Sequence, residues 1–309
     1  MKKLITGVEK MRKGARLIIV LIAAVFLLPV IAEQKAFADS LTAWGINDYG
    51  QCNVPLGDDF VAIAADMFYS LALKSDGSIV GWGLNDFGQA SPPDGNDFVD
   101  IAAGGYHGLA LKSDGSIVGW GRNDFGQASP PDGNDFVAIA AGGYHSLALK
   151  SDGSIVGWGW NKNKKYAQAS PPAGNDFDAI AAGACYSLAL KSDGSIVSWG
   201  WKGYYGGRKP NPPDGNDFVA IAAGDLHGLA LKSDGSIVGW GFNGTGQASP
   251  PDGNDFVAIA AGHWHSLALK LDGSIVGWGH DSFLAGLPAG NDFVAIEAGY
   301  VHSLALKSD

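Results

Sequence analysis

The sequence lacks several features that would point to common protein classes. Only two of its 309 residues are cysteines, Cys52 and Cys185. No window carries apolar residues at i, i+3, i+4 and i+7 for the length of a helix, which argues against a helical bundle or an α/β fold. The longest apolar run, residues 17–32, has 16 residues, whereas a membrane-spanning helix needs about 20. These absences leave an all-β protein that does not depend on disulfides as the expected class.

Basic residues are also scarce. The first 38 residues hold seven of the 21 basic and two of the 31 acidic residues, which leaves 14 basic against 29 acidic residues from Asp39 onward, a net charge of −15. Such a chain would repel phosphates, whose neutralisation drives nucleic-acid binding. The charge therefore argues against a nucleic-acid partner.

The first 38 residues have the order of a secretory signal peptide. A basic segment, 1–16, precedes the apolar run, and Ala36-Phe37-Ala38 is a small-x-small cleavage site before Asp39. We expect cleavage after Ala38, a secreted or extracytoplasmic protein and no stable membrane span afterwards. An uncleaved anchor is the alternative, and Met11 is an alternative start.

The rest of the chain consists of repeats. A Trp-Gly pair recurs seven times at steps of 38 or 41 residues, and a phenylalanine opens each unit. A period of this size is typical of solenoids, propellers and arrays. The tryptophans are Trp44, Trp82, Trp120, Trp158, Trp199, Trp240 and Trp278.

One unit reads as a set of short strands. Residues 136–140 form an apolar run, 146–149 alternate at period two, and 154–158 follow a Ser-Asp-Gly-Ser hairpin turn. A Pro-Pro-x-Gly-Asn-Asp linker excludes helix there. With a weaker fourth strand around residues 168–170, the unit predicts a four-stranded propeller blade.

The chain ends indicate how the repeats close. The sequence stops at Asp309 where a Ser-Ile-Val-Gly-Trp-Gly strand should follow, and residues 39–45 supply a similar strand at the other end. Pairing the N-terminal strand with the C-terminal blade would leave no open blade edge. We therefore predict an all-β, seven-bladed β-propeller over residues 39–309, and expect it to be a monomer.

The repeat resembles a known family. The pattern Ala-Ala-Gly-x-x-His-Ser-Leu-Ala-Leu-x-x-Asp-Gly-x-x-x-x-Trp-Gly-x-Asn-x-x-Gly-Gln is similar to the regulator of chromosome condensation repeat, most fully at 102–127 and 140–159. The resemblance covers residues 39–309 and implies the propeller fold. The family includes a nuclear nucleotide-exchange factor that binds chromatin. It also includes secreted bacterial propellers, among them a β-lactamase inhibitor. The expected export favours the secreted kind.

Residue types that could carry chemistry have simpler interpretations. Five histidines share one repeat position, which Tyr69 and Tyr186 occupy in the other copies, so we expect one structural hydrogen bond per blade. The Asp-Gly-Asn-Asp turns lack the oxygen spacing of a calcium loop. Cys52 and Cys185 fall in blades nearly across the ring, so we expect two free, partly buried thiols. We predict no catalytic residue, no metal and no cofactor, although a carboxylate pair in the central channel stays open.

The copies differ from each other in two places, the pair before each His or Tyr and the residue after each Trp-Gly. Alternating strand directions would place both on one face and the uniform hairpins and linkers on the other. The variable positions carry residue types that anchor interfaces, although loops tolerate drift. The predicted binding residues are Phe68, Tyr106, Arg122, Tyr144, Trp160, Tyr166, Trp201, Tyr204, Tyr205, Phe242 and Trp264.

Two loops on this face, after Trp158 and Trp199, are three residues longer than the rest and rich in Lys, Trp and Tyr. They suggest a binding hot spot for an acidic protein or an anionic polysaccharide. We predict a non-enzymatic propeller that binds a protein, in one form by inhibiting an extracellular enzyme. The alternatives are a carbohydrate or cell-wall binder, with Trp160, Trp201, Tyr204, Tyr205 and Trp264 as stacking platforms, and an enzyme with its site at the channel mouth.

Overall fold

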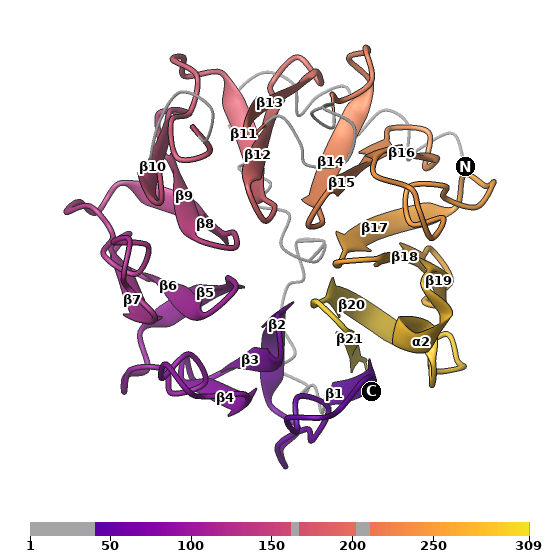
Figure 1. The fold of residues 1–309 in the computed structure, drawn as a ribbon, viewed down its shortest axis with the longest axis horizontal. Helices are drawn as coiled ribbons and strands as arrows, with labels where there is room; N and C mark the ends of the chain where they lie inside the picture. The colour runs from indigo at the N-terminus through magenta and orange to yellow at the C-terminus, as the bar shows by residue number, and fades with distance from the viewer. Residues whose placement is uncertain (1–40, 162–166, 202–210, 309) are drawn as a thin grey trace, which may run out of the picture.

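The computed structural model describes residues 41–161, 167–201 and 211–308. They form seven three-stranded antiparallel sheets arranged as blades around a central axis (Figure 1). The predicted seven-bladed propeller is confirmed.

Each blade has an inner, a middle and an outer strand. The inner strands begin at the repeat phenylalanine: β2 (Phe60–Asp66), β5 (Phe98–Ala103), β8 (Phe136–Ala141), β11 (Phe177–Ala182), β14 (Phe218–Ala223), β17 (Phe256–Ala261) and β20 (Phe293–Ala298). The middle strands carry the Leu-Ala-Leu-Lys segment: β3 (Tyr69–Lys74), β6 (His107–Lys112), β9 (His145–Lys150), β12 (Tyr186–Lys191), β15 (His227–Lys232), β18 (His265–Lys270) and β21 (His302–Lys307). The outer strands contain the Trp-Gly pair: β4 (Ile79–Gly83), β7 (Ile117–Gly121), β10 (Ile155–Gly159), β13 (Ile196–Gly200), β16 (Ile237–Gly241), β19 (Ile275–Gly279) and β1 (Leu41–Gly45).

The ring closes as predicted. Strand β1 is the outer strand of the last blade and pairs antiparallel with β21, with Leu41 opposite Leu306 and Gly45 opposite His302. In Figure 1 the first strand of the described chain lies beside the last one. The two ends of the chain therefore share one sheet.

The core lies between blades rather than within any one of them. Leu71 and Leu73 of β3 pack on Phe98 and Ile101 of the next blade, and the same arrangement recurs around the ring. The first five residues of every middle strand are buried. Because each blade covers its neighbour's apolar face, a blade has no separate core of its own.

The fourth strand expected around residues 168–170 is not found. Ser170 N donates to Ala167 O in a turn, and the carbonyl of Gln168 accepts from Ser187 Oγ and Trp199 Nε1 at 2.9 and 2.8 Å. Side chains of the neighbouring strands therefore occupy the hydrogen-bonding positions that a fourth strand would need. One helical turn, α2 (Asp281–Leu284), was not predicted; it follows β19.

The repeated histidine makes the structural hydrogen bond that the sequence predicted, and the structure shows that this bond joins two blades. His107 Nε2 lies 2.8 Å from Ser146 Oγ of the next blade. Because that hydroxyl donates to Gln127 O, the imidazole is the donor to the hydroxyl. The same pairs are His145–Ser187, His227–Ser266, His265–Ser303 and His302–Ser70.

At two of the seven blade junctions, both the histidine and its serine partner are replaced. Where the serine position is Gly108 or Gly228, the preceding blade carries Tyr69 or Tyr186 instead of histidine. The Tyr69 hydroxyl donates to His107 O at 2.5 Å, and the Tyr186 hydroxyl donates to His227 O. The exchange keeps a buried inter-blade hydrogen bond at both positions.

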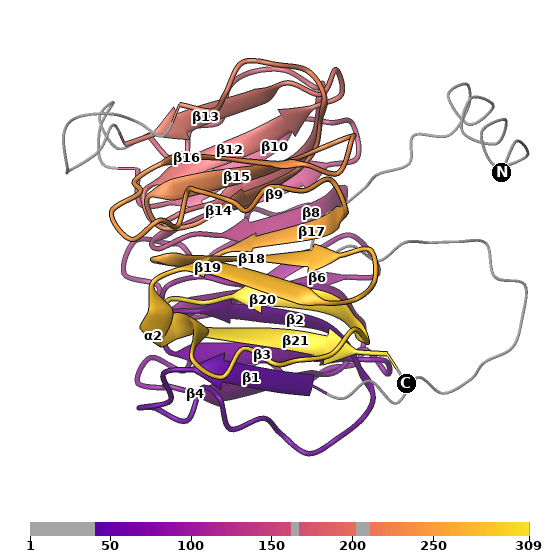
Figure 2. The same ribbon diagram turned by 90° about the vertical axis from the view of Figure 1, so that its right-hand side faces the viewer.

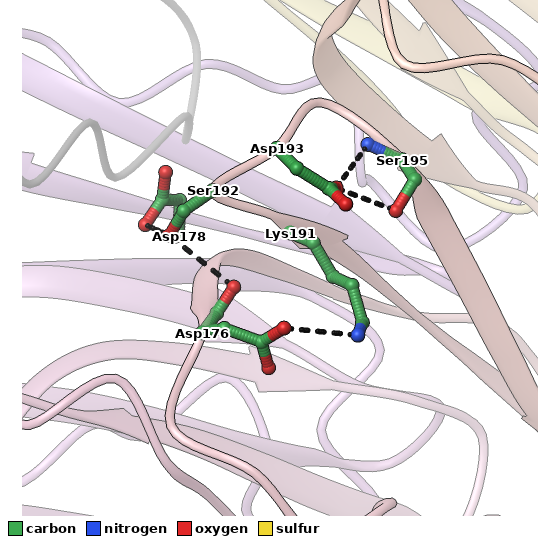
Figure 3. Close-up of polar contacts among 6 residues, drawn as sticks. All are labelled: Asp176, Asp178, Lys191, Ser192, Asp193 and Ser195. Atoms are coloured by element: carbon green, nitrogen blue, oxygen red, sulfur yellow. Dashed lines mark hydrogen bonds and ion pairs between the residues drawn. The ribbon is translucent and has the colours of Figure 1, made fainter.

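The hairpins and linkers form one face of the disc, here called the constant face. In one copy Lys191 Nζ donates to Asp176 Oδ2 at 2.9 Å, and Asp193 accepts from the N–H and hydroxyl of Ser195 (Figure 3). Seven Lys–Asp pairs of this kind, at 2.9–3.2 Å, lie around the described ring. These local contacts account for the uniform hairpin and linker sequences.

Candidate functional site

The variable face, defined by the inner–middle turns and the loops after the outer strands, lies opposite the constant face. Helix α2 marks it at the left of the disc in Figure 2. In every blade, the residue after Trp-Gly donates its N–H to the carbonyl of the residue before the His or Tyr. The pairs are Ile46–Val301, Leu84–Phe68, Arg122–Tyr106, Trp160–Tyr144, Trp201–Cys185, Phe242–Leu226 and His280–Trp264, at 2.8–3.0 Å. The two variable positions of each copy are therefore neighbours.

Six side chains on this face form the first patch. Arg122 lies over three rings, with its guanidinium carbon 4.9 Å from the centroid of Phe87, 5.7 Å from Tyr106 and 5.8 Å from Tyr144. Phe125 and Trp160 continue the patch, since both pack on Tyr144 and lie 5.7 Å from each other. Cation–π contacts of this type hold the guanidinium in place.

A second patch runs over the blades that close the ring. Tyr49 packs on Phe68 at 4.9 Å, and Phe68 packs on Tyr300 at 5.7 Å. Tyr300 stacks on His263 with ring centroids 3.9 Å apart, and His263 stacks on Trp264 at 4.7 Å. His280 completes this second patch through Trp264 at 5.8 Å.

The structure brings most of the predicted binding residues together. Phe68, Tyr106, Arg122, Tyr144, Trp160 and Trp264 belong to the two patches, and backbone bonds place Trp201 and Phe242 on the same face. Tyr166, Tyr204 and Tyr205 lie outside the described residues, as do the lysines and the arginine of the two long loops. The hot spot expected there stays a prediction.

The predicted binding residues leave out six rings that the structure places in the patches. Three of them, His263, His280 and Tyr300, stand at variable positions, and the other three do not. Tyr49, Phe87 and Phe125 are 51, 46 and 43% exposed and come from Asn-Asp-aromatic-Gly-Gln loops. That motif is nearly uniform in these three copies, so a search for variable positions passes over it. The aromatic residue that the three loops share could have identified these rings from the sequence.

The loops that carry these rings are held rigidly. The N–H of Phe87 donates to the Gln89 side chain at 3.0 Å, and Asn85 bonds to both Ala90 and Ser91. Gln89 itself is fully buried. Rings presented on an ordered loop lose little conformational entropy on binding.

Polar groups gather where the second patch meets the central channel. His263 Nδ1 contacts the Asp225 carboxylate, and Asp66 accepts from the N–H of Met67 at 2.5 Å. Met67 has a φ of +21°, a strained conformation that often occurs at functional sites. Burial raises the pKa of Asp66 to about 8, with a further contribution from Asp225.

The cysteines and histidines behave as the sequence predicted. Cys52 and Cys185 are unpaired and half-buried, and desolvation raises the pKa of each thiol to about 11. Burial lowers the pKa of the five inter-blade histidines to about 3. In the described ranges, no group of three His, Cys, Asp or Glu could hold a metal ion, and no helix is long and apolar enough to span a membrane.

Comparisons with solved structures identify the fold. Prp20p from Saccharomyces cerevisiae is 19% identical with a TM-score of 0.72, covering 89% of this chain and 92% of its own. Human WBSCR16 is 17% identical with a TM-score of 0.72, covering 87% of this chain and 99% of its own. The ectodomain of the receptor kinase ACR4 from Arabidopsis thaliana is 22% identical with a TM-score of 0.64, over 75% of this chain and 84% of its own. No curated protein sequence matches.

Sequence comparison identifies the repeat itself. The regulator of chromosome condensation (RCC1) repeat matches residues 60–89, 98–127, 136–164, 218–247 and 256–283. These are five of the seven copies, and the other two are the copy that begins at Phe177 and the copy shared by the chain ends. The chain folds as a seven-bladed β-propeller in which five copies match the RCC1 repeat.

Proposed function

We propose that this propeller is an exported, non-enzymatic protein that binds another protein through its variable face. The observation that carries the proposal is that seven backbone bonds bring the variable positions together, and that their rings form two continuous patches. Exposed aromatic side chains in groups, with an arginine among them, are typical of interface hot spots. Prp20p, which shares the fold, binds Gsp1p and histones, and this supports protein binding as a use of such a propeller.

The histidines support a scaffold role rather than catalysis. All five lie at the same repeat position, are fully buried and form a hydrogen bond with a serine of the next blade. A general base would need access to substrate and a pKa nearer neutrality. Inhibition of an extracellular enzyme is one form that the proposed binding would take.

The test uses paired variants on the two faces. Phe87→Ser with Phe125→Ser removes two exposed rings from the first patch, and their loops keep the Asn and Gln contacts. Leu56→Ser with Leu271→Ser is the control, because these residues are 101 and 79% exposed in a linker and a hairpin of the constant face. The parent protein serves as bait for extracellular proteins of its source, and the affinity of each variant for the captured partner is then measured.

Loss of the two rings should weaken binding by about tenfold or more, since a buried hot-spot ring contributes about 2 kcal/mol. The control should bind as the parent does. If the variant without the two rings binds the partner as tightly as the control does, the first patch is not the binding site. Retention on insoluble polysaccharide without a captured protein would favour the carbohydrate binder instead.

Export has its own measurement. The N-terminal residue of the protein recovered from outside the cytoplasm should be Asp39, because cleavage is expected after Ala38. Recovery of the protein only with intact residues 1–38 would support the uncleaved anchor.

A further inference from the structure

A cavity of about 350 Å³ lies along the axis of the ring, where the inner strands meet. Its wall consists mainly of alanine, glycine and isoleucine from all seven inner strands and the turns that follow them. Such a wall offers apolar surface and close approach but little chemistry. The few larger polar side chains therefore decide what the cavity would bind.

Those side chains are acidic or aromatic. Three carboxylates line the cavity, Asp66, Asp225 and Glu297, and no lysine or arginine is among its described lining residues. The rings that line it belong to Tyr106, Tyr144, His263 and Tyr300. Carboxylates and ring faces both attract cations, and more strongly in a water-poor cavity.

The carboxylates occupy different depths. Counted from the phenylalanine that opens each copy, Glu297 is the fifth residue and Asp66 the seventh. Asp100, the third residue of its copy, is buried but is not a lining residue of the cavity. Strand geometry separates successive levels by roughly 6.6 Å. Burial raises the pKa of Glu297, and the charge of Asp100, which lies in another blade, raises it further.

Few basic groups lie near these carboxyl groups, since His263 is the one basic side chain among the described lining residues of the cavity. Asp100 Oδ2 is buried without a hydrogen-bond partner among the described residues, while its Oδ1 accepts from Ile101 N at 2.8 Å. Burial raises the pKa of Asp66, Asp100 and Glu297 to about 8. These groups are mostly protonated near neutral pH, and a cation inside the cavity would pair with those that ionise.

We propose that the central channel binds a linear aliphatic polyamine, with its ammonium groups at successive carboxylate levels and its methylene groups against the alanine wall. An extended organic cation fits better than a metal ion, since the described carboxylates are spread over several levels rather than clustered. The tyrosine rings at the mouth add cation–π attraction for the outer ammonium group. Arg122 borders the mouth, but its guanidinium is paired with Asp124 at 2.5 Å. The site shares the rings of Tyr106, Tyr144, His263 and Tyr300 with the two patches, but its carboxylates belong to neither patch.

Calorimetric titration of the purified protein with spermidine tests the site. We expect saturable binding of one molecule per chain. Binding should strengthen by about tenfold between about pH 6 and about pH 8.5, because the carboxylic acids must ionise to pair with ammonium. At neutral pH the titration should release protons, seen as a dependence of the heat on the buffer's ionisation enthalpy. His263 and the lining tyrosines are the other titratable groups that face the ligand.

Two isosteric changes of equal charge locate the binding. Glu297→Gln should weaken spermidine binding by about tenfold, the loss expected for one buried charge-assisted pair. Asp132→Asn, which removes an exposed carboxylate from a linker of the constant face, should leave binding unchanged. Circular dichroism and thermal unfolding would verify that both variants fold.

Three results would overturn the proposal. One is absence of binding to the parent protein at both pH values. Another is equal weakening by the two substitutions, which would indicate attraction to the acidic surface alone. The third is unaltered affinity in the folded Glu297→Gln variant.

Discussion

Burial shifts the pKa values of histidines and of carboxyl groups in opposite directions in this protein. The five inter-blade histidines have pKa values of about 3, because burial disfavours the imidazolium. Asp66, Asp100 and Glu297 have pKa values of about 8, because burial disfavours the carboxylate. Both sets are therefore mostly neutral at about pH 6.5, the ordinary pKa of histidine.

The two sets make stability depend on pH in opposite directions. A histidine with a lowered pKa contributes stability that is complete above about pH 6.5 and is lost as the pH falls towards 3. A carboxyl group with a raised pKa contributes stability that is complete below about pH 4 and is lost as the pH rises towards 8. Between about pH 4 and about pH 6.5 the effect of five histidines exceeds that of three carboxyl groups, so the free energy of unfolding rises with pH. It should be greatest at about pH 6.5.

At alkaline pH, the pH dependence of the free energy of unfolding reports mainly on the buried carboxyl groups. Above about pH 6.5 the histidines of the unfolded state lose their remaining protons and their effect fades. Towards pH 8 the free energy of unfolding should fall by up to about 1.4 kcal/mol per pH unit for each carboxyl group. The double variant Asp100→Asn, Glu297→Gln should lose much less over this interval. Urea unfolding at the two pH values measures the difference. A parent protein equally stable at both would show that these groups ionise freely in the fold.

At the scale of one element, each hairpin turn and the loop after an outer strand need glycine for different reasons. Gly115 lies in the hairpin turn with a φ of +83°, and a Cβ there would lie 2.3 Å from the carbonyl oxygen of Asn134. Gly126 lies in the loop with a φ of +78°, and no atom lies within 4 Å of a Cβ built on it. The hairpin glycine is needed for both its conformation and its lack of a side chain, and the loop glycine for its conformation alone.

These two glycines form a matched pair for mutation. Gly126→Ala should lower the free energy of unfolding by about 1–2 kcal/mol, the penalty of the left-handed conformation. Gly115→Ala should lower it by about 3 kcal/mol or more, because the linker backbone must also move. Thermal and urea unfolding of both variants gives the comparison. Equal losses would mean that the linker on the constant face yields without penalty.

At the scale of the whole molecule, stability depends on the ring being closed. Strand β1 covers the outer edge of β21, and Trp44 is buried in the cluster that joins the last two blades. Without β1, the edge of β21 would expose unpaired backbone groups that promote aggregation.

Deletion of residues 1–45 should therefore lower the unfolding midpoint and produce oligomers, while deletion of residues 1–38 should leave a stable monomer. Size-exclusion chromatography and thermal unfolding distinguish the two forms. A monomeric 1–45 deletion with an unchanged midpoint would show that β21 does not need its outer partner.

Much of this architecture was predictable because it is written in local, repeated sequence. The period of the Trp-Gly pairs predicted seven blades, and the split seventh copy predicted the pairing of β1 with β21. Alternating strands predicted a constant and a variable face, which the bond from Arg122 N to Tyr106 O and its equivalents confirm. The number of strands per blade was predicted wrongly, because the residues around Gln168 bond to side chains from two other strands.

The sequence by itself determined the repeat, its closure and which residues share a face, since each follows from neighbours along the chain or from a regular period. Only the tertiary structure decided which side chains meet across blades. Phe87 joins Arg122 of the next copy, and the charge of Asp100 in the second blade adds to the effect of burial on the pKa of Glu297 in the last blade. Such meetings depend on the radius of the ring and on the direction of each side chain, which no short stretch of sequence specifies.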